Sequence, residues 1–243
     1  MYAQWPSRLE GAVVWTRTVQ GPHACPVLPD GCMDLLWTDG TLLVAGPDTH
    51  AHATDTASVI RYAGVRFAPG AGPAILGVPA YELRDRRVEL TDLWPAADAR
   101  RHTERIDTAA DPAAALEALA LRRAAGAEPP DPLLRSVARQ LGAGRSVAAT
   151  AAAVGLGPRQ LHRRSLEAFG YGPKTLGRIL RLQRALALVT GGAPYADAAL
   201  RSGCTDQAHL AREMRDLAGM PMSAYVAAAN SDTSQPSGSS SVA

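Results

Sequence analysis

An internal repeat in the C-terminal half of this 243-residue chain constrains its fold more than any other feature. Shifting the sequence by 49 residues aligns Leu161 with Leu210 and Gly170 with Gly219. Each copy has the same order of parts: a helix of small residues, a tight turn that starts with glycine, and a second helix. This order is the pattern of a helix-turn-helix. The sequence therefore predicts two tandem helix-turn-helix units.

The ends of the predicted helices carry residues that favour helix termini. The first helix of each copy, 147–154 and 196–202, stops at a glycine, Gly155 or Gly203. Glycine readily takes the left-handed conformation of a helix end. Asp206 is suited to cap the second helix of the later copy.

Residues 173–189, between the two units, predict one continuous helix. At 1.5 Å per residue, about sixteen residues give a length of about 24 Å. Such a spacer would hold the two units close to one DNA turn apart.

The second helix of each copy has an apolar stripe and an opposite face. In the later copy Leu210, Met214 and Leu217 recur at helical spacing and should pack inward. In the earlier copy Leu161 occupies that stripe, but Ser165 stands where a large apolar group is expected.

The opposite face of the earlier copy carries Arg159, His162 and Arg163 at spacings of three and four residues. A row of this kind can enter the major groove, where arginine reaches the acceptor atoms of guanine. The predicted DNA contacts are Arg159, Gln160, His162, Arg163, Arg164, Lys174, Arg178, Gln207, His209, Arg212 and Arg215. Further phosphate contacts, which would make the affinity salt-dependent, are predicted for Arg135, Arg145 and Arg181.

The charge is divided unequally along the chain. The whole chain has a formal net charge of +2, but residues 1–131 carry −5 and residues 132–228 carry +8. This asymmetry is typical of a DNA-binding domain joined to an acidic or neutral partner domain.

The N-terminal half has a different texture. Residues 11–67 contain short runs of apolar, β-branched and aromatic residues separated by Pro, Gly and Asp, which predicts strands. Two helices are expected at 96–106 and 112–125. The class is therefore α+β, with predicted boundaries of 1–125 for a β-rich domain with C-terminal helices, 126–132 (GAEPPDP) for a linker, 133–229 for the DNA-binding domain and 230–243 for a disordered tail.

The stretches LHRRSLEAFGYGPKTLGRILRLQRALALV and AALRSGCTDQAHLAREMRDLAGMPMSAY resemble the DNA-binding domain of the AraC/XylS transcription regulators. The resemblance implies two helix-turn-helix units joined by a long helix, with double-stranded promoter DNA as partner. Three positions depart from the family pattern: Cys204 replaces an aromatic residue, Ser165 replaces phenylalanine, and Pro221-Met222 replaces Ser-Pro.

The segments LPDGCMDLLW, GVRFAPG and LGVPAYEL resemble a sensor domain found ahead of such DNA-binding domains. This implies a cupin-like module that binds a small-molecule effector or mediates dimerisation, in a chain that is either a homodimer or a monomer. The family favours activation, with RNA polymerase as a further candidate partner. The candidate effector residues are Cys32, Asp34, Trp37, Arg66 and Phe67, and Arg66 would suit an anionic ligand.

Other classes of function find little support. No apolar run is long enough for a membrane span, the N-terminus lacks a signal-peptide pattern, and three cysteines favour a reducing cytoplasm. No nucleophile elbow, phosphate loop or metalloprotease helix is present, so no enzyme, cofactor or metal site is predicted.

One alternative uses the cysteines of the N-terminal half. Cys25 and Cys32, with His23, His50 and His52, offer a metal- or thiol-based sensor, or an alkyl acceptor with a DNA-targeting domain. The Cys25–Cys32 spacing is not that of a zinc ribbon. Cys32 is therefore expected to be a small buried residue of a strand, and Cys204 a structural core residue.

Overall fold

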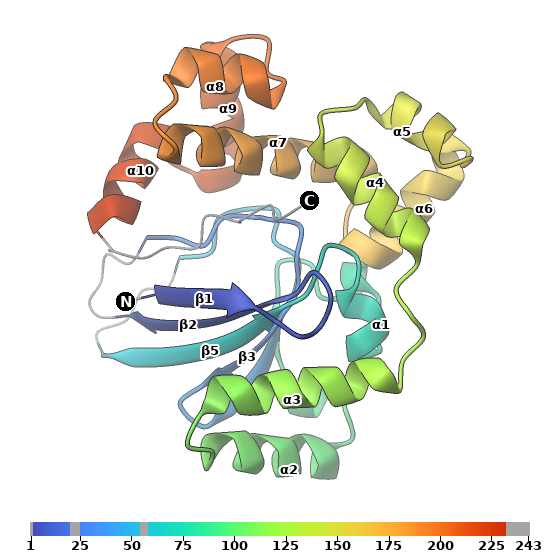
Figure 1. Ribbon diagram of the computed structural model, residues 1–243, viewed down its shortest axis with the longest axis vertical. Coiled ribbons are helices and arrows are strands. Elements are labelled where there is room, and N and C mark those ends of the chain that lie inside the picture. The colour runs from blue at the N-terminus through green and yellow to red at the C-terminus, as the bar shows by residue number, and fades with distance from the viewer. Residues whose placement is uncertain (1, 20–24, 54–57, 232–243) are drawn as a thin grey trace.

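The computed structural model describes residues 2–19, 25–53 and 58–231, without the side chains of 230–231 (Figure 1). The N-terminal part is built on an antiparallel sheet with the strand order β1-β2-β5-β3-β4-β6. The strands are β1 (Tyr2–Pro6), β2 (Val13–Val19), β3 (Asp34–Thr38), β4 (Thr41–Ala45), β5 (Ile60–Arg66) and β6 (Arg87–Glu89). The strands predicted within 11–67 are confirmed as β2 to β5.

The sequence analysis missed the two edge strands. Strand β1 is mostly exposed, so it has no alternation of apolar and polar residues to detect. Strand β6 has three residues, which is too short for a pattern. Cys32 was expected within a strand, but β3 begins at Asp34, because the loop before it turns at Gly31 with a φ of +85°.

Helices cover one face of the sheet. The connecting and covering elements are α1 (Gly72–Leu76), η1 (Ala80–Glu82), η2 (Leu90–Asp92), α2 (Ala96–Asp107) and α3 (Pro112–Ala125). Leu116 and Leu119 of α3 pack onto Val14, Leu35 and Val65 of the central strands, and all five side chains are almost completely buried. Figure 1 shows α2 and α3 together on this side of the sheet, and the C-terminal helices on the other side.

The C-terminal part is helical throughout its described length, as predicted. Its helices are α4 (Pro132–Gly142), α5 (Val147–Ala153), α6 (Pro158–Phe169), α7 (Pro173–Thr190), α8 (Tyr195–Ser202), α9 (Gln207–Ala218) and α10 (Met222–Ser231). Helices α5 and α6 form the first helix-turn-helix, and α8 and α9 form the second. The long helix α7 joins and contacts both. Residues 232–243 of the predicted tail lie outside the described residues.

The terminus signals read from the sequence operate as predicted. Gly155 and Gly203 have φ angles of +66° and +94° in the two turns, and the side chain of Asp206 accepts a hydrogen bond from the backbone N–H of His209. Leu161 and Leu210, which the repeat aligns, are both buried in one C-terminal core.

Ser165 is a weak point of this core. It is completely buried, and its hydroxyl has no hydrogen-bond partner among the described residues. A buried hydroxyl without a partner loses its hydration and gains nothing in return.

Replacing Ser165 with alanine is therefore expected to raise the free energy of unfolding by about 1 kcal/mol. The control is Ser202→Ala, because Ser202 is equally buried but its Oγ donates to the carbonyl oxygen of Ala199 at 2.9 Å. Urea unfolding of both variants measures the difference. Stabilisation by both substitutions, or by neither, would contradict this account.

Segments of the N-terminal part complete the C-terminal core. Cys25 and Leu28, which follow β2, are buried among the side chains of the C-terminal helices. Gln183 of α7 donates a buried hydrogen bond to the carbonyl oxygen of Pro29 at 2.6 Å. The backbone N–H of Ala51 donates to the carbonyl oxygen of Leu217 at 2.7 Å. In Figure 1 these segments pass between the sheet and helices α7 and α10.

Candidate functional sites

Helix α6 presents the predicted base-reading residues to solvent. Arg159, Gln160 and Arg163 are exposed, and none of them has a hydrogen bond or ion pair within the part of the chain that the structure describes. Their polar groups are therefore available to DNA. His162 is also exposed, but its ring lies against Gly172 so closely that a β-carbon there would come within 2.7 Å of it. The imidazole thus also packs against the start of α7.

Helix α9 presents fewer free groups. Gln207, Arg212 and Arg215 are exposed. His209 is half-buried, with its Nδ1 3.3 Å from the backbone N–H donor of Thr205 and its Nε2 3.6 Å from an oxygen of Glu213. His209 therefore contacts its own unit.

Glu213 is a buried acid that the sequence analysis did not single out. Its side chain is 5% exposed, and it forms ion pairs with Arg178, at 3.3 Å, and with Arg181 of α7. Burial raises the pKa of Glu213, but the hydrogen bonds and charge of Arg181 outweigh it, so that the pKa lies below its ordinary value. The sequence did contain a signal for the burial of Glu213, because this residue directly precedes Met214 of the inward stripe.

Several predicted phosphate contacts are engaged within the chain. Arg178 also binds Asp216, at 2.8 Å. Arg164 pairs with Asp131, which caps α4, at 3.1 Å. An ion pair that already exists must break before its arginine can bind a phosphate, so these arginines are poorer candidates than Lys174, which is exposed at the start of α7.

An open cleft of about 600 Å³ lies between the two helix-turn-helix units, along α7. Its wall includes the turn before α5 and the inward edge of α9. Five cationic side chains, Arg145, Lys174, Arg178, Arg181 and Arg212, and two acidic ones, Glu213 and Asp216, line it together with His209. The excess of cations suits the approach of a phosphate backbone.

On the face of the sheet opposite α2 and α3, three of the candidate effector residues form part of a polar cluster. Asp34 and Arg66 are register partners on β3 and β5, and their side chains pair at 3.2 Å. Arg66 also pairs with Asp30 at 3.1 Å, and the indole N–H of Trp15 donates to Asp34 at 2.7 Å. The backbone N–H of Cys32 donates to Asp30 at 2.9 Å, so Cys32 joins this cluster. The sequence analysis did not assign Trp15 or Asp30 to the effector site.

The charges of this cluster are largely satisfied. Burial lowers the pKa of Arg66, but Asp30 and Asp34 outweigh it and hold that pKa above its ordinary value. Burial raises the pKa of Asp34, and Arg66 only partly offsets it. An anionic ligand would have to displace a carboxylate from Arg66. Arg66 is thus not free, within the described residues, for the anionic effector suggested by the sequence.

The other two candidate effector residues lie on the opposite face. Trp37 and Phe67 are buried in the core beneath α2 and α3, and the indole N–H of Trp37 donates to Asp107 at 3.2 Å. The reason is the alternation of a strand, since neighbouring residues such as Arg66 and Phe67 point to opposite sides of a sheet. The five candidates therefore do not line one site.

Thiol chemistry finds no support in the surroundings of the cysteines. Cys25 and Cys204 are buried, and burial together with the charge of Asp30 raises the pKa of Cys32. Reactive cysteines need a lowered pKa and access to solvent. His23, part of the proposed metal sensor, lies outside the described residues.

Comparison with known proteins gives the context for this geometry. A family model described as a helix-turn-helix domain matches residues 150–228, which span both units and α7. The crystal structure of ToxT from Vibrio cholerae O395 shares the fold over 88% of this chain and 97% of that chain, with a TM-score of 0.50 and 9% identity. Residues 150–228 thus form a helix-turn-helix domain, in a chain that has the fold of ToxT.

Two further solved structures are similar to this chain. ToxT bound to (E)-4-(8-methylnaphthalen-1-yl)but-3-enoic acid has a TM-score of 0.51 at 10% identity and covers 88% of this chain and 98% of that chain. A probable AraC family regulator from Rhodopseudomonas palustris CGA009 is 26% identical over 40% of this chain and 96% of that chain, with a TM-score of 0.35. No curated protein matches.

The N-terminal part has its own family match. Residues 12–89 match a domain of unknown function (DUF6597). The antiparallel sheet is consistent with the cupin-like sensor module expected ahead of an AraC/XylS-type DNA-binding domain. None of the described helices is both long and apolar enough to cross a membrane. The helix-turn-helix match makes the chain a DNA-binding transcription regulator, built from a sheet domain and a tandem helix-turn-helix domain.

Proposed function

We propose that this regulator activates transcription under the control of a small-molecule effector bound by its N-terminal domain. The observation that carries the proposal is the shared core: Cys25 and Leu28 of the N-terminal part are buried among the DNA-binding helices. A change in the N-terminal domain therefore acts directly on the packing of the DNA-binding domain.

A short path connects the polar cluster to the long helix. Asp30 pairs with Arg66, and its neighbour Pro29 accepts the buried hydrogen bond from Gln183 of α7. An effector that competes for Arg66 or Asp30 would shift this loop and with it α7, which joins the two units. The proposed effector residues are thus Asp30, Cys32, Asp34 and Arg66, with Trp15 beside them.

The DNA-binding half of the proposal rests on exposure and charge. The proposed base readers are Arg159, Arg163, Gln207 and Arg212, and Lys174 and Arg215 would contact phosphates. RNA polymerase is the proposed partner in activation, with the chain acting as a homodimer or a monomer. The ligand in the ToxT structure supports effector binding by this architecture.

The proposal is tested by DNA affinity in variants of the distant cluster. An operator is first found by binding-site selection with the full-length chain. We then expect Arg66→Gln to change the affinity of the protein for this operator and the output of a promoter reporter. Gln183→Leu removes the hydrogen bond from α7 to Pro29 and should change the operator affinity in the same direction. The control is Arg61→Gln, on the same strand β5 but largely exposed, where the guanidinium pairs with Asp39 at 3.6 Å and lies over the ring of Trp37 at 5.6 Å, away from the polar cluster.

Thermal melts confirm that each variant is folded, and native mass spectrometry of the purified chain identifies a bound effector. Salt-dependent operator binding that is identical in wild type and in both folded cluster variants would show that the two parts are not coupled. Absence of any operator binding at low salt would contradict the DNA-binding function itself.

A further inference from the structure

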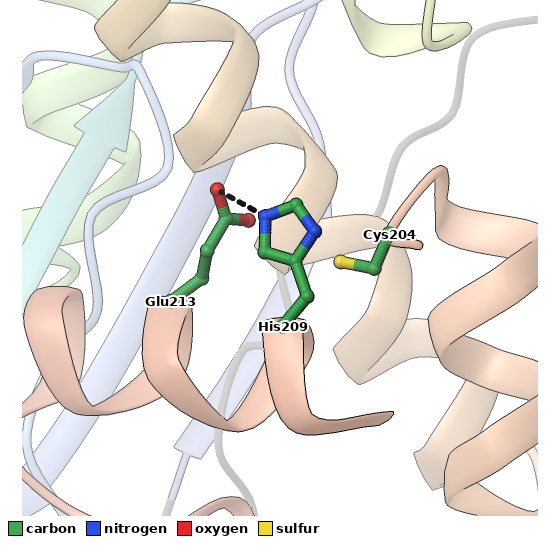
Figure 2. Close-up of side chains that lie close together, drawn as sticks. All are labelled: Cys204, His209 and Glu213. Atoms are coloured by element: carbon green, nitrogen blue, oxygen red, sulfur yellow. Dashed lines mark ion pairs between the residues drawn. The ribbon is translucent and has the colours of Figure 1, made fainter. Parts of the chain in front are cut away.

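We propose that Cys204, His209 and Glu213 form a binding site for one divalent metal ion such as Zn²⁺, in the second helix-turn-helix (Figure 2). One donor atom of each residue lies within 4.8 Å of the donor atoms of the other two. Figure 2 shows the imidazole of His209 between the sulfur of Cys204 and the carboxylate of Glu213, with both of these groups pointing toward the ring.

The donor set is one that zinc uses. Thiolate, imidazole and carboxylate bind Zn²⁺ at about 2.0–2.3 Å, and three protein ligands leave a fourth position for water. In a tetrahedral shell the ligand atoms are about 3.3–3.8 Å apart. Nε2 of His209 and Oε1 of Glu213 are already 3.6 Å apart, and all donor pairs lie within 4.8 Å. Binding one ion therefore requires the side chain of Cys204 to approach and the imidazole to turn between the other two ligands.

The turn and the helix hold the donors in register. Cys204 directly follows Gly203, which takes the left-handed conformation that ends α8. His209 and Glu213 are four residues apart on α9, so they lie on the same helix face. The backbone N–H of Thr205 approaches Nδ1 of His209 at 3.3 Å, which leaves Nε2 toward Glu213. Since His209 and Glu213 also line the open cleft, an ion can reach them from solvent.

Arg178 and Arg181 are the competitors of the ion. Both pair with Glu213 in the described structure, and a cation bound to the same carboxylate would repel them. Metal binding and arginine pairing are therefore alternative states of Glu213. In the metal-bound state one thiolate and one carboxylate balance the ion, and the two released arginines make the cleft more cationic.

The experiment is a titration of the metal-free, full-length chain with Co²⁺, a spectroscopic probe for zinc sites, followed by displacement with Zn²⁺. We expect one equivalent to give a thiolate-to-cobalt charge-transfer band. Cys204→Ser should abolish the band, and His209→Ala should weaken binding by at least about 100-fold, since even the loss of groups behind the ligands costs 10–100-fold. Cys32→Ser is the control and should keep the band.

A second variant tests the competition. Arg181→Gln should bind Co²⁺ about tenfold more tightly, because it removes a positive charge from beside the carboxylate. The proposal is overturned if folded wild type gives no band at one equivalent, if the band survives Cys204→Ser, or if Arg181→Gln binds no more tightly. The wild-type titration tests for the metal site even if a variant misfolds. Operator binding without metal is measured in a separate experiment.

Discussion

Replacing Arg159 or Arg163 with alanine is expected to reduce base discrimination at one half of the operator by about 1–3 kcal/mol, roughly 5- to 150-fold. Both side chains are exposed on α6 and have no partner in the described ranges, so their guanidinium groups are free to bind a guanine edge with two hydrogen bonds. The loss should be confined to the base pairs that these side chains contact.

The two recognition helices should contribute unequally. The 49-residue repeat aligns Arg159 and Arg163 with Ala208 and Arg212. Helix α9 thus has one arginine where α6 has two, and an alanine offers at most a methyl contact to thymine. His209 does not restore the balance, because it faces Glu213.

Binding-site selection on the full-length chain, followed by competition titrations at one salt concentration, measures the effect. Arg164→Ala is a matched control on the same helix, since Arg164 is tied to Asp131 and should not read bases. Ala208→Ser should also change little. If the strongest base preferences map to the half-site under residues 207–212, the inequality runs the other way and the prediction is wrong.

The helical half was the more predictable part of this fold, and the reason is physical. Helix signals are local: Gly203 ends one helix and Asp206 starts the next within a few residues, and Leu210 and Met214 share a face by spacing alone. The repeat supplied the same information twice, so each copy checked the other.

The candidate effector residues were harder to place from the sequence, because strand register decides which residues lie together on one face of a sheet. Trp37 and Arg66 are both large side chains in strands, but only the pairing of β3 with β5 decides which face each one occupies. One part of this arrangement could have been inferred from the sequence, because adjacent strand residues such as Arg66 and Phe67 cannot share a face. Their partners Trp15 and Asp30 belong to other segments of the chain, and no local sequence pattern predicts that they join this cluster.

Replacing Gly170 with alanine is expected to lower the free energy of unfolding of the full chain by about 2–4 kcal/mol. Gly170 ends α6 with a φ of +79°, which costs any residue with a β-carbon about 1–2 kcal/mol. A β-carbon there would also come within 2.5 Å of Pro47 and 3.1 Å of the carbonyl oxygen of Ala80, both in the N-terminal part. The clash adds the cost of overpacking at the contact between the two domains.

The repeat provides the control. Gly219 is the equivalent residue at the end of α9, with a φ of +69°, and within the described residues no atom lies within 4 Å of the position that a β-carbon would occupy there. Gly219→Ala should therefore show the backbone cost alone, about 1–2 kcal/mol. Urea unfolding of the two variants separates backbone strain from the contact between the domains.

Hydrogen exchange locates the difference. In Gly170→Ala, amides near Pro47 and Ala80 should exchange faster, because the clash is relieved by moving the N-terminal domain away from the first helix-turn-helix. In Gly219→Ala these amides should keep their wild-type rates. Equal destabilisation by the two substitutions, with unchanged exchange at both segments, would mean that the domains are not held in contact at Gly170. The coupling between effector and DNA would then have to run through the other described contacts between the two parts, such as Pro29 with Gln183 and Ala51 with Leu217.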